Sequence, residues 1–195
     1  MTSLTRRREQ MSHTIKTQHI AAAIHTSADL DVRHYLNGVF VDSRVIVSTD
    51  GHCASAYLGE ECDEYLPPFI IPTDAAKLIG KLKCAYATVT AMPDGRIDIG
   101  GVVFKPVDGT FPDYKRVFAG KAGAEAHNMQ FSPDLIMKFQ KVAQALKASC
   151  KVPYLYATEG GMGFRVAIQG KESEFMGVLM PFELKDKPFV CGDWL

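Results

Sequence analysis

The stretch Ser132-Pro-Asp-Leu-Ile-Met-Lys-Phe-Gln-Lys-Val-Ala-Gln-Ala-Leu146 gives the clearest view of how this chain folds. Its Ser-Pro-Asp opening is typical of a helix start, with proline at the first helical position. Apolar residues then recur at helical spacing and predict one buried stripe, made of Leu135, Ile136, Phe139, Val142, Ala143 and Leu146. A short alternating stretch at 128–131 precedes the helix, and strand-like runs follow at 154–158, 163–169 and 174–181. The predicted order is strand, helix and three strands.

The same order recurs twice ahead of this stretch. In the middle part, a strand at 69–71 precedes a helical stripe of Ala75, Leu78, Ile79 and Leu82, and strands are predicted at 86–91, 96–99 and 102–107. In the first part, a strand at 13–17 and a helix at 18–28 precede strands at 35–41, 44–48 and 53–58. We therefore predict an α+β chain of three βαβββ units of about 55 residues each. The alternative is an unrelated α+β domain whose strands merely follow its helices.

Charge and cysteine content exclude several classes of protein. The chain has 22 Lys plus Arg and 22 Asp plus Glu in 195 residues, which argues against a wholly basic nucleic-acid coat but permits a segregated basic face. The five cysteines are odd in number and lack C-x-x-C spacing, so we expect neither a disulfide framework nor a zinc site, and a cytoplasmic location. No apolar run has the roughly 18 residues of a membrane span. Residues 1–11 are expected to form a disordered basic arm, with Met11 as an alternative start.

Three stretches resemble the bacterial sliding clamp family, the beta subunit of DNA polymerase III. Asp31-Val-Arg-His-Tyr-Leu-Asn-Gly38 followed by Val47-Ser-Thr-Asp-Gly-His52 is similar to the middle domain of that family. Val107-Asp-Gly-Thr-Phe-Pro-Asp-Tyr-Lys-Arg-Val117 resembles the segment that closes the same domain, and Val178-Leu-Met-Pro-Phe182 resembles the terminal strand. The resemblance implies a DNA-clamp fold with one complete domain at 12–120, built from halves 12–62 and 63–120, and a further half-domain at 121–184. The tail 185–195 extends past the family's end, and the reduced size resembles a clamp carried by a phage or mobile element.

The resemblance also implies a ring around duplex DNA, with helices facing the phosphates. Because each unit has one helix for four strands, two units can share a core and a third is left over. We therefore expect a homodimer or homotetramer, one arrangement being two chains that join their third units into a shared domain. The DNA-binding residues expected by resemblance and by charge on the helices are Arg33, His34, Tyr35, Lys77, Lys81, Lys138 and Lys141. The alternative for the lysines is a merely solubilising helix face.

A second surface implied by the resemblance is an apolar pocket for short peptides of polymerases and other clamp-binding proteins. The matching positions are Leu36, Thr49, Gly51, His52, Val178, Met180, Pro181 and Phe182. Adaptable thioether and aromatic side chains suit peptides that contain leucine and phenylalanine. Cys53-Ala54 replaces the family's Arg-Leu, Ala119 stands where a proline is expected and Glu183 replaces a basic residue, so a smaller and less basic pocket is expected. The alternative for 178–182 is a plain core strand.

No catalytic pattern emerges from the sequence. Asp50 and His52 have no nucleophile at a readable spacing, and Gly160-Gly161-Met-Gly163 precedes a strand rather than opening a helix. We therefore expect a non-enzymatic processivity factor that uses no cofactor or metal and has no membrane partner. The alternative is a clamp-derived peptide-binding adaptor or decoy that does not encircle DNA, favoured by the zero net charge and by the lack of Lys or Arg between Lys16 and Arg33.

Overall fold

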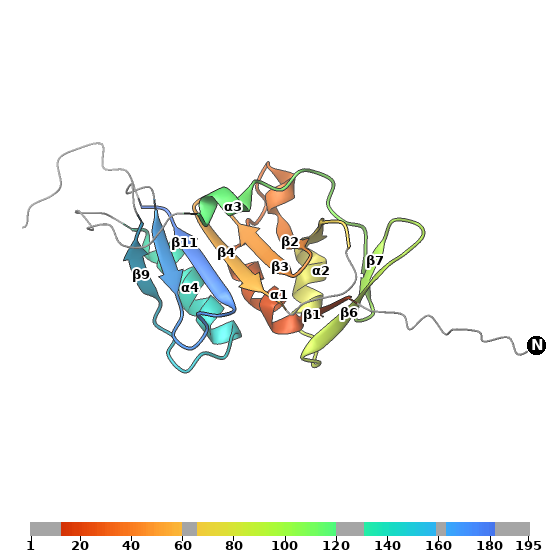
Figure 1. The fold of residues 1–195 in the computed structure, drawn as a ribbon. Helices are drawn as coiled ribbons and strands as arrows, with labels where there is room; N and C mark the ends of the chain where they lie inside the picture. The colour runs from red at the N-terminus through yellow and green to blue at the C-terminus, as the bar shows by residue number, and fades with distance from the viewer. Residues whose placement is uncertain (1–12, 60–65, 120–130, 159–162, 182–195) are drawn as a thin grey trace, which may run out of the picture.

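The computed structural model describes residues 13–59, 66–119, 131–158 and 163–181. Their strands form two antiparallel sheets (Figure 1). The larger sheet has seven strands in the order β5 (Phe69–Pro72), β2 (Gly38–Asp42), β3 (Val45–Thr49), β4 (Cys53–Leu58), β11 (Phe175–Leu179), β10 (Phe164–Ala167) and β9 (Tyr154–Ala157). The smaller sheet has the order β1 (His13–Lys16), β6 (Tyr86–Ala91), β7 (Ile97–Ile99) and β8 (Val102–Phe104). The mixed α+β class predicted from the sequence is confirmed.

The first set of elements comprises β1–β4 with α1, and the second comprises β5–β8 with α2. These two sets exchange their first strands. β1 comes directly before α1 (Thr17–Ala23) but pairs with β6, so that Ile15 lies opposite Ala87. β5 comes directly before α2 (Thr73–Ile79) but pairs with β2, so that Val39 lies opposite Ile71. Each sheet therefore contains one strand from the other set, and this exchange joins residues 13–59 to residues 66–104.

The third set of elements extends the larger sheet. α4 (Pro133–Ala145) is followed by β9, β10 and β11, and β11 pairs with β4 over five residues from Phe175 opposite Tyr57 to Leu179 opposite Cys53. α1 packs between α2 and α4, and all three helices lie on the same side of the molecule (Figure 1). The contact between α1 and α2 is close, because a Cβ at Gly80 would lie 3.0 Å from the Cα of Ala21.

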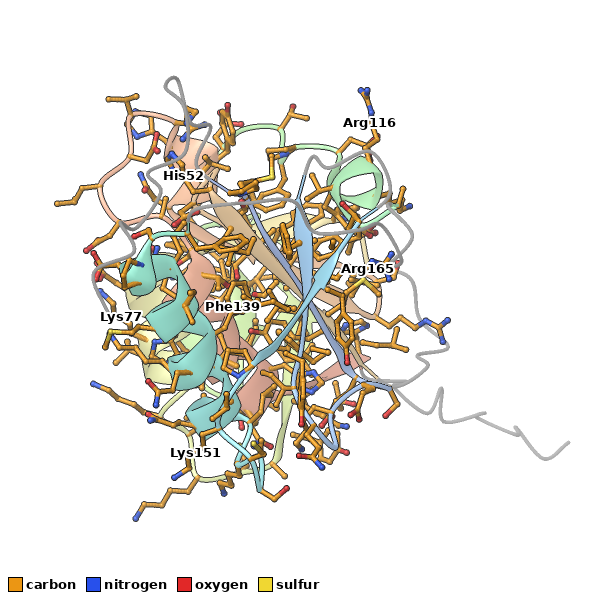
Figure 2. All side chains as sticks on the ribbon, turned by 90° about the vertical axis from the view of Figure 1, so that its left-hand side faces the viewer. His52, Lys77, Arg116, Phe139, Lys151 and Arg165 are labelled. Atoms are coloured by element: carbon orange, nitrogen blue, oxygen red, sulfur yellow. The ribbon has the colours of Figure 1, made fainter. Side chains whose placement is uncertain are left out.

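One hydrophobic core runs beneath the three helices. Its fully buried members include Ile20 of α1, Ile79 of α2 and Phe139 of α4, together with Tyr57 and Leu179 of the sheet. Figure 2 shows Phe139 pointing from α4 into the interior. Its ring meets that of Phe175 edge-on at 6.5 Å. Burial of such rings is the main stabilising contribution expected here, at roughly 25 cal/mol per Å² of apolar surface.

Several predicted boundaries are wrong. The helix at 18–28 ends at Ala23 and continues as a 3-10 turn, Ile24–Thr26, because the Ala23 carbonyl accepts hydrogen bonds from the hydroxyls of Thr26 and Ser48. The strand predicted at 35–41 begins only at Gly38, after a 3-10 turn at His34–Leu36. α2 ends at Ile79, so Lys81 and Leu82 lie beyond it, and Leu78 is 56% exposed rather than part of the buried stripe.

Other predictions concern parts of the chain that the structure does not describe. They are the basic arm, the strand at 128–131 except for Phe131, and the tail at 185–195. A short helix that the sequence analysis did not predict, α3 (Tyr114–Val117), follows β8 and lies against the seven-stranded sheet.

Candidate functional site

A pocket of about 190 Å³ opens where β4 meets β11. Its walls come from three parts of the chain that are distant in sequence: the loop and turns around β3 and β4, the segment around α3, and the end of β11. The lining residues are Arg33, Tyr35, Leu36, Val47, Thr49, Gly51, His52, Cys53, Ala54, Phe111, Pro112, Tyr114, Val117, Val178 and Met180. The pocket is mostly apolar, with polar groups at its rim.

The turn between β3 and β4 forms the first wall. The Asp50 carboxylate accepts hydrogen bonds from the backbone N–H groups of His52 and Cys53, both at 2.8 Å. The Thr49 hydroxyl donates to the Cys53 carbonyl at 2.7 Å and accepts from the Gly51 N–H at 3.0 Å. Gly51 has a φ of +91°, which glycine adopts without strain. The turn is therefore fixed by its own polar groups, and His52 stands exposed at the pocket rim.

Arg33 lies across this turn. Its guanidinium donates to Asp31 at 2.8 Å, and a Cβ at Gly51 would lie 3.0 Å from one of its terminal nitrogens. The hydrogen bonds from Arg33 lower the pKa of Asp31 to about 2. Arg33 is thus placed at the pocket and is paired with a carboxylate.

The second wall is the end of β11. Val178 lies opposite Ala54 in the ladder, and the Met180 N–H donates to the His52 carbonyl at 2.9 Å. The Met180 side chain is 44% exposed, so its thioether is available at the rim. Cys53, which also lines the pocket, is buried, and this burial raises the pKa of its thiol and keeps it protonated.

The segment around α3 forms the third wall, which the sequence analysis did not assign to the pocket. Phe111 stacks on Phe40 with 4.5 Å between ring centroids, and the Tyr114 hydroxyl donates to Asp42 at 2.9 Å. Burial, and then the hydrogen bond to Asp42, raise the pKa of Tyr114 to about 12. Pro112 and Val117 complete the wall. The signal was present in the sequence, because these residues belong to the stretch 107–117 that carries the family resemblance.

Six of the eight predicted pocket residues line this one pocket: Leu36, Thr49, Gly51, His52, Val178 and Met180. Pro181 is not among the lining residues. Phe182 lies outside the described residues.

The predicted DNA-binding residues lie in two places. Arg33 and Tyr35 line the pocket, and His34 is exposed beside them. Lys77 and Lys141 are exposed on α2 and α4, and Lys81 is exposed just after α2. Figure 2 shows Lys77 on the side of α4, together with Lys151, and away from Arg116 and Arg165.

Lys138 has a different environment. Its ammonium group donates to the Asp50 carboxylate, joining α4 to the turn after β3. Burial of Asp50 raises its pKa, but the hydrogen bonds from Lys138 and from two backbone N–H groups outweigh this and lower the pKa overall. Lys138 thus holds the third set of elements against the first.

A broader hollow of about 670 Å³ lies around the ends of α1, α2 and α4. Lysines from all three sets of elements line it: Lys16, Lys83, Lys147 and Lys171. Glu174 pairs with Lys16 at 3.3 Å and with Lys171 at 2.8 Å, which offsets part of their charge. The helical pattern of the sequence did not indicate Lys16, Lys83 and Lys171, because none of them lies on a helix.

The described residues contain no group of three His, Cys, Asp or Glu residues placed to hold a metal ion. None of their helices has the length and apolarity needed to cross a membrane.

These features define a class of fold. Two antiparallel sheets accompanied by few helices match the domains of the DNA-clamp fold. Comparison with family models gives no match.

Three known proteins are similar to this chain in sequence or in fold. The chain is 32% identical to the beta sliding clamp of Vibrio cholerae over 133 residues, which is 58% of this chain and 36% of that protein. The DNA polymerase III beta subunit of Thermotoga maritima superposes with a TM-score of 0.66 at 14% identity, covering 94% of this chain and 68% of the other. The Helicobacter pylori beta clamp bound to a DNA ligase peptide gives a TM-score of 0.66 at 13% identity, covering 88% and 66%. The chain is thus similar in sequence to a bacterial beta sliding clamp and in fold to DNA polymerase III beta subunits, and its sequence match spans about a third of that curated relative.

Proposed function

We propose that this protein is a sliding clamp-like processivity factor. In this proposal an oligomer encircles duplex DNA and tethers a polymerase or repair protein through the pocket between β4 and β11. The observation that carries the proposal is the pocket itself, where six positions expected from the family resemblance meet although they are up to 144 residues apart, from Leu36 to Met180. The proposed role needs no catalytic group.

The pocket suits a short apolar peptide. Val178, Met180 and Val117 offer aliphatic and thioether surface, and Phe111 and Tyr114 offer aromatic surface. A groove of this kind favours leucine and phenylalanine side chains, with polar rim groups available to orient the peptide backbone. The H. pylori clamp, which shares this fold, was solved with a peptide of DNA ligase.

The helix side suits a sequence-independent contact with DNA. Exposed lysines on α2 and α4 flank α1, which carries none, so positive charge lies on either side of a neutral strip. Lysines that reach phosphates give affinity without reading bases. Arg33 and Lys138 are the weaker candidates for DNA contact, because each is already paired with an aspartate.

Peptide binding can be tested by fluorescence anisotropy with a labelled synthetic peptide that ends in leucine and phenylalanine. Met180→Ala should weaken binding about tenfold, because the loss of roughly 1.4 kcal/mol of apolar contact is a factor of ten. Leu78→Ala is the matched control, since Leu78 is similarly exposed but lies on α2. Equal affinity of both variants and the wild type would exclude this pocket as the binding site.

Encirclement can be tested by gel filtration with nicked circular DNA. The protein should remain with the circle and be lost when the same DNA is linearised, because a ring slides off free ends. Equal retention on both forms would show simple adhesion.

The second candidate function is a peptide-binding adaptor that does not encircle DNA. It is favoured by the lack of cations on α1 and by the internal pairing of Arg33 and Lys138. This candidate predicts pocket-dependent peptide binding together with no retention on circular DNA.

A further inference from the structure

A second groove lies beside the pocket, with a volume of about 390 Å³. Strands β3, β4 and β11 and the segment around α3 supply its lining. Its apolar lining residues include Val45, Ala56, Leu58, Tyr114, Phe118 and Met176, and we call it the side groove. The pocket and the side groove are separate hollows, and the proposed function uses only the pocket.

The pocket and the side groove follow the same two strands. Alternate side chains of a strand lie on one face of a sheet, so Met176 shares a face with Val178 and Met180, which line the pocket. On β4, Ala54 lies opposite Val178 and Ala56 lies opposite Met176. Four residues of extended chain span about 13 Å, which is the separation expected between Met176 and Met180. The two hollows therefore lie in line along β11.

The segment around α3 forms a wall that both hollows share. Tyr114 lines both of them, whereas Val117 lines the pocket and Phe118 lines the side groove. The Phe118 carbonyl accepts a hydrogen bond from Nη2 of Arg165 at 2.7 Å. Arg165 lies on β10 opposite Val178, so this bond crosses β11 at the boundary between the hollows. Figure 2 shows Arg165 on the side of the molecule away from α4. The bond holds the shared wall in place, and with it the spacing of the two hollows.

Apolar side chains are exposed along the whole line. Met180 and Val117, at the pocket, are 44% and 47% exposed, and Leu58, at the side groove, is 42% exposed. Single exposed apolar side chains are ordinary, but a continuous series that extends a binding pocket is typical of an interaction surface. The apolar surface available to a peptide is therefore longer than the pocket alone.

The charged residues of the side groove indicate what kind of peptide it would accept. Lys115 is exposed at the shared wall, with its Nζ 5.8 Å from the centroid of the Tyr114 ring. Glu172 is exposed in the turn before β11, at the end of the side groove that lies away from the pocket. A peptide that passes from one hollow to the other would thus meet a cation midway. Complementary charge would favour an acidic side chain there.

We propose that the side groove binds a second apolar side chain of the same client segment that fills the pocket. The client is an extended peptide with two apolar anchors about four residues apart and an acidic residue between them. One anchor enters the pocket, the other enters the side groove, and the acidic residue pairs with Lys115. This inference rests on the proposed function, because it lengthens the peptide that the pocket binds.

Fluorescence anisotropy with labelled synthetic peptides tests the proposal. The short peptide ends in leucine and phenylalanine and reaches only the pocket. Two extended peptides add a phenylalanine four residues from the leucine, with an aspartate between them, one before the Leu-Phe pair and one after it, because an extended client can run in either direction. The better of the two should bind the wild-type protein about tenfold more tightly than the short peptide, since it buries one more apolar side chain.

Variants of the side groove should affect only the extended peptide. Leu58→Ala and Met176→Ala should each remove most of the tenfold gain and leave the affinity for the short peptide unchanged. Met180→Ala should weaken the binding of both peptides. Met137→Ala is the matched control, because Met137 is a 51% exposed methionine on α4, and it should change neither affinity. Far-UV circular dichroism of each variant checks that the fold is retained.

A change of charge at the shared wall tests the position of the acidic residue. Lys115→Glu should weaken binding of the aspartate-containing extended peptide about fivefold and strengthen binding of the same peptide with lysine in place of aspartate. Lys141→Glu, an exposed change on α4, is the control and should alter neither affinity. Equal effects of the two variants would show that only overall charge matters, which would contradict the pairing with Lys115.

Other outcomes separate this inference from the proposed function. If the short peptide binds in the pocket and neither extension tightens binding, the side-groove proposal fails while the pocket proposal stands. If the extended peptide binds through Leu58 and Met176 but without dependence on Met180, the side groove stands and the pocket proposal fails. Light scattering supplies a further check, because a lower oligomer mass for Leu58→Ala or Met176→Ala would show that copies of this chain cover the groove, and would overturn the inference.

Discussion

Phe139 shows how one residue joins the third set of elements to the rest. Its side chain is fully buried, and a Cβ at Gly177 would lie 2.6 Å from its ring, so β11 must carry glycine for α4 to approach. Phe139→Ala should lower the free energy of unfolding by about 3–5 kcal/mol, measured by urea denaturation.

The control for this change is Gln140→Ala, the next residue on α4, whose side chain is exposed. It should change the stability by less than about 0.5 kcal/mol. Similar losses in the two variants would show that general helix effects, rather than core packing, determine the result.

Glu174 gives the protein a pH dependence. Its burial raises its pKa, but hydrogen bonds from Lys171 and His19 outweigh this and bring the pKa down to about 2, below the ordinary value of 4.5. A lowered pKa means that the folded state favours the ionised carboxylate. Its contribution to stability is therefore complete above pH 4.5 and is lost as the pH falls toward 2.

His19 acts in the same direction. Burial lowers its pKa below the ordinary 6.5, although the hydrogen bond with Glu174 partly opposes this. The folded state holds the ring neutral, with Nε2–H donating to Glu174 at 3.1 Å. Its contribution is present above pH 6.5 and declines as the pH falls.

Glu174→Gln should flatten the fall in stability between pH 4.5 and 2, as followed by urea denaturation at a series of pH values. Asp108→Asn, an exposed carboxyl-to-amide change, is the control and should keep the wild-type slope. An unchanged slope for Glu174→Gln would show that other carboxyl groups govern acid unfolding.

At the scale of elements, α4 is held by both apolar packing and polar contacts. Gln18 of α1 donates to the Ala145 carbonyl at 2.9 Å near the end of α4, and Lys138 donates to Asp50 near its start. Lys138→Met should cost about 1–2 kcal/mol of stability, because it leaves the largely buried Asp50 carboxylate without its cation.

Lys141→Met is the control, since Lys141 lies one turn along α4 and is exposed. We expect little change in stability for this variant. A double-mutant cycle with Asp50→Asn should show coupling between positions 50 and 138, and additive effects would contradict a direct pairing.

The elements differ in how far the sequence predicts them. α4 was placed correctly because its Ser-Pro-Asp start and its apolar stripe are local signals, and the turn between β6 and β7 was predicted from Pro93-Asp94-Gly95. The end of α1 at Ala23 was not predicted, because it depends on a hydroxyl of Ser48, which lies 25 residues away. The pairing of β1 with β6 likewise depends on contacts between distant residues that no local pattern records.

The lining of the pocket was also predicted only in part, because it too depends on contacts between residues that are distant in sequence. The residues around Thr49 and Val178 were found through family resemblance, whereas Phe111 and Tyr114 were missed as pocket residues. The pairing of Lys138 with Asp50 could not be read from a helical pattern, which shows only that Lys138 lies opposite the apolar stripe.

At the scale of the whole molecule, the proposed DNA face should be visible in salt dependence. The double variant Lys77→Gln and Lys141→Gln should reduce the slope of log affinity against log salt for duplex DNA by about 0.9 per lost phosphate contact. Arg116→Gln is the control, because Arg116 lies on the other side of the molecule (Figure 2). Equal slopes for both variants would exclude the helix side as the DNA face.

The ladder between β4 and β11 has a consequence for biosynthesis. Val178 and Met180 emerge from the ribosome more than a hundred residues after the turn at Thr49 that they meet. If the pocket binds client peptides as proposed, a growing or prematurely stopped chain has no docking place for a client, however well its earlier parts have folded. On that proposal, only molecules whose translation has passed β11 can recruit a client.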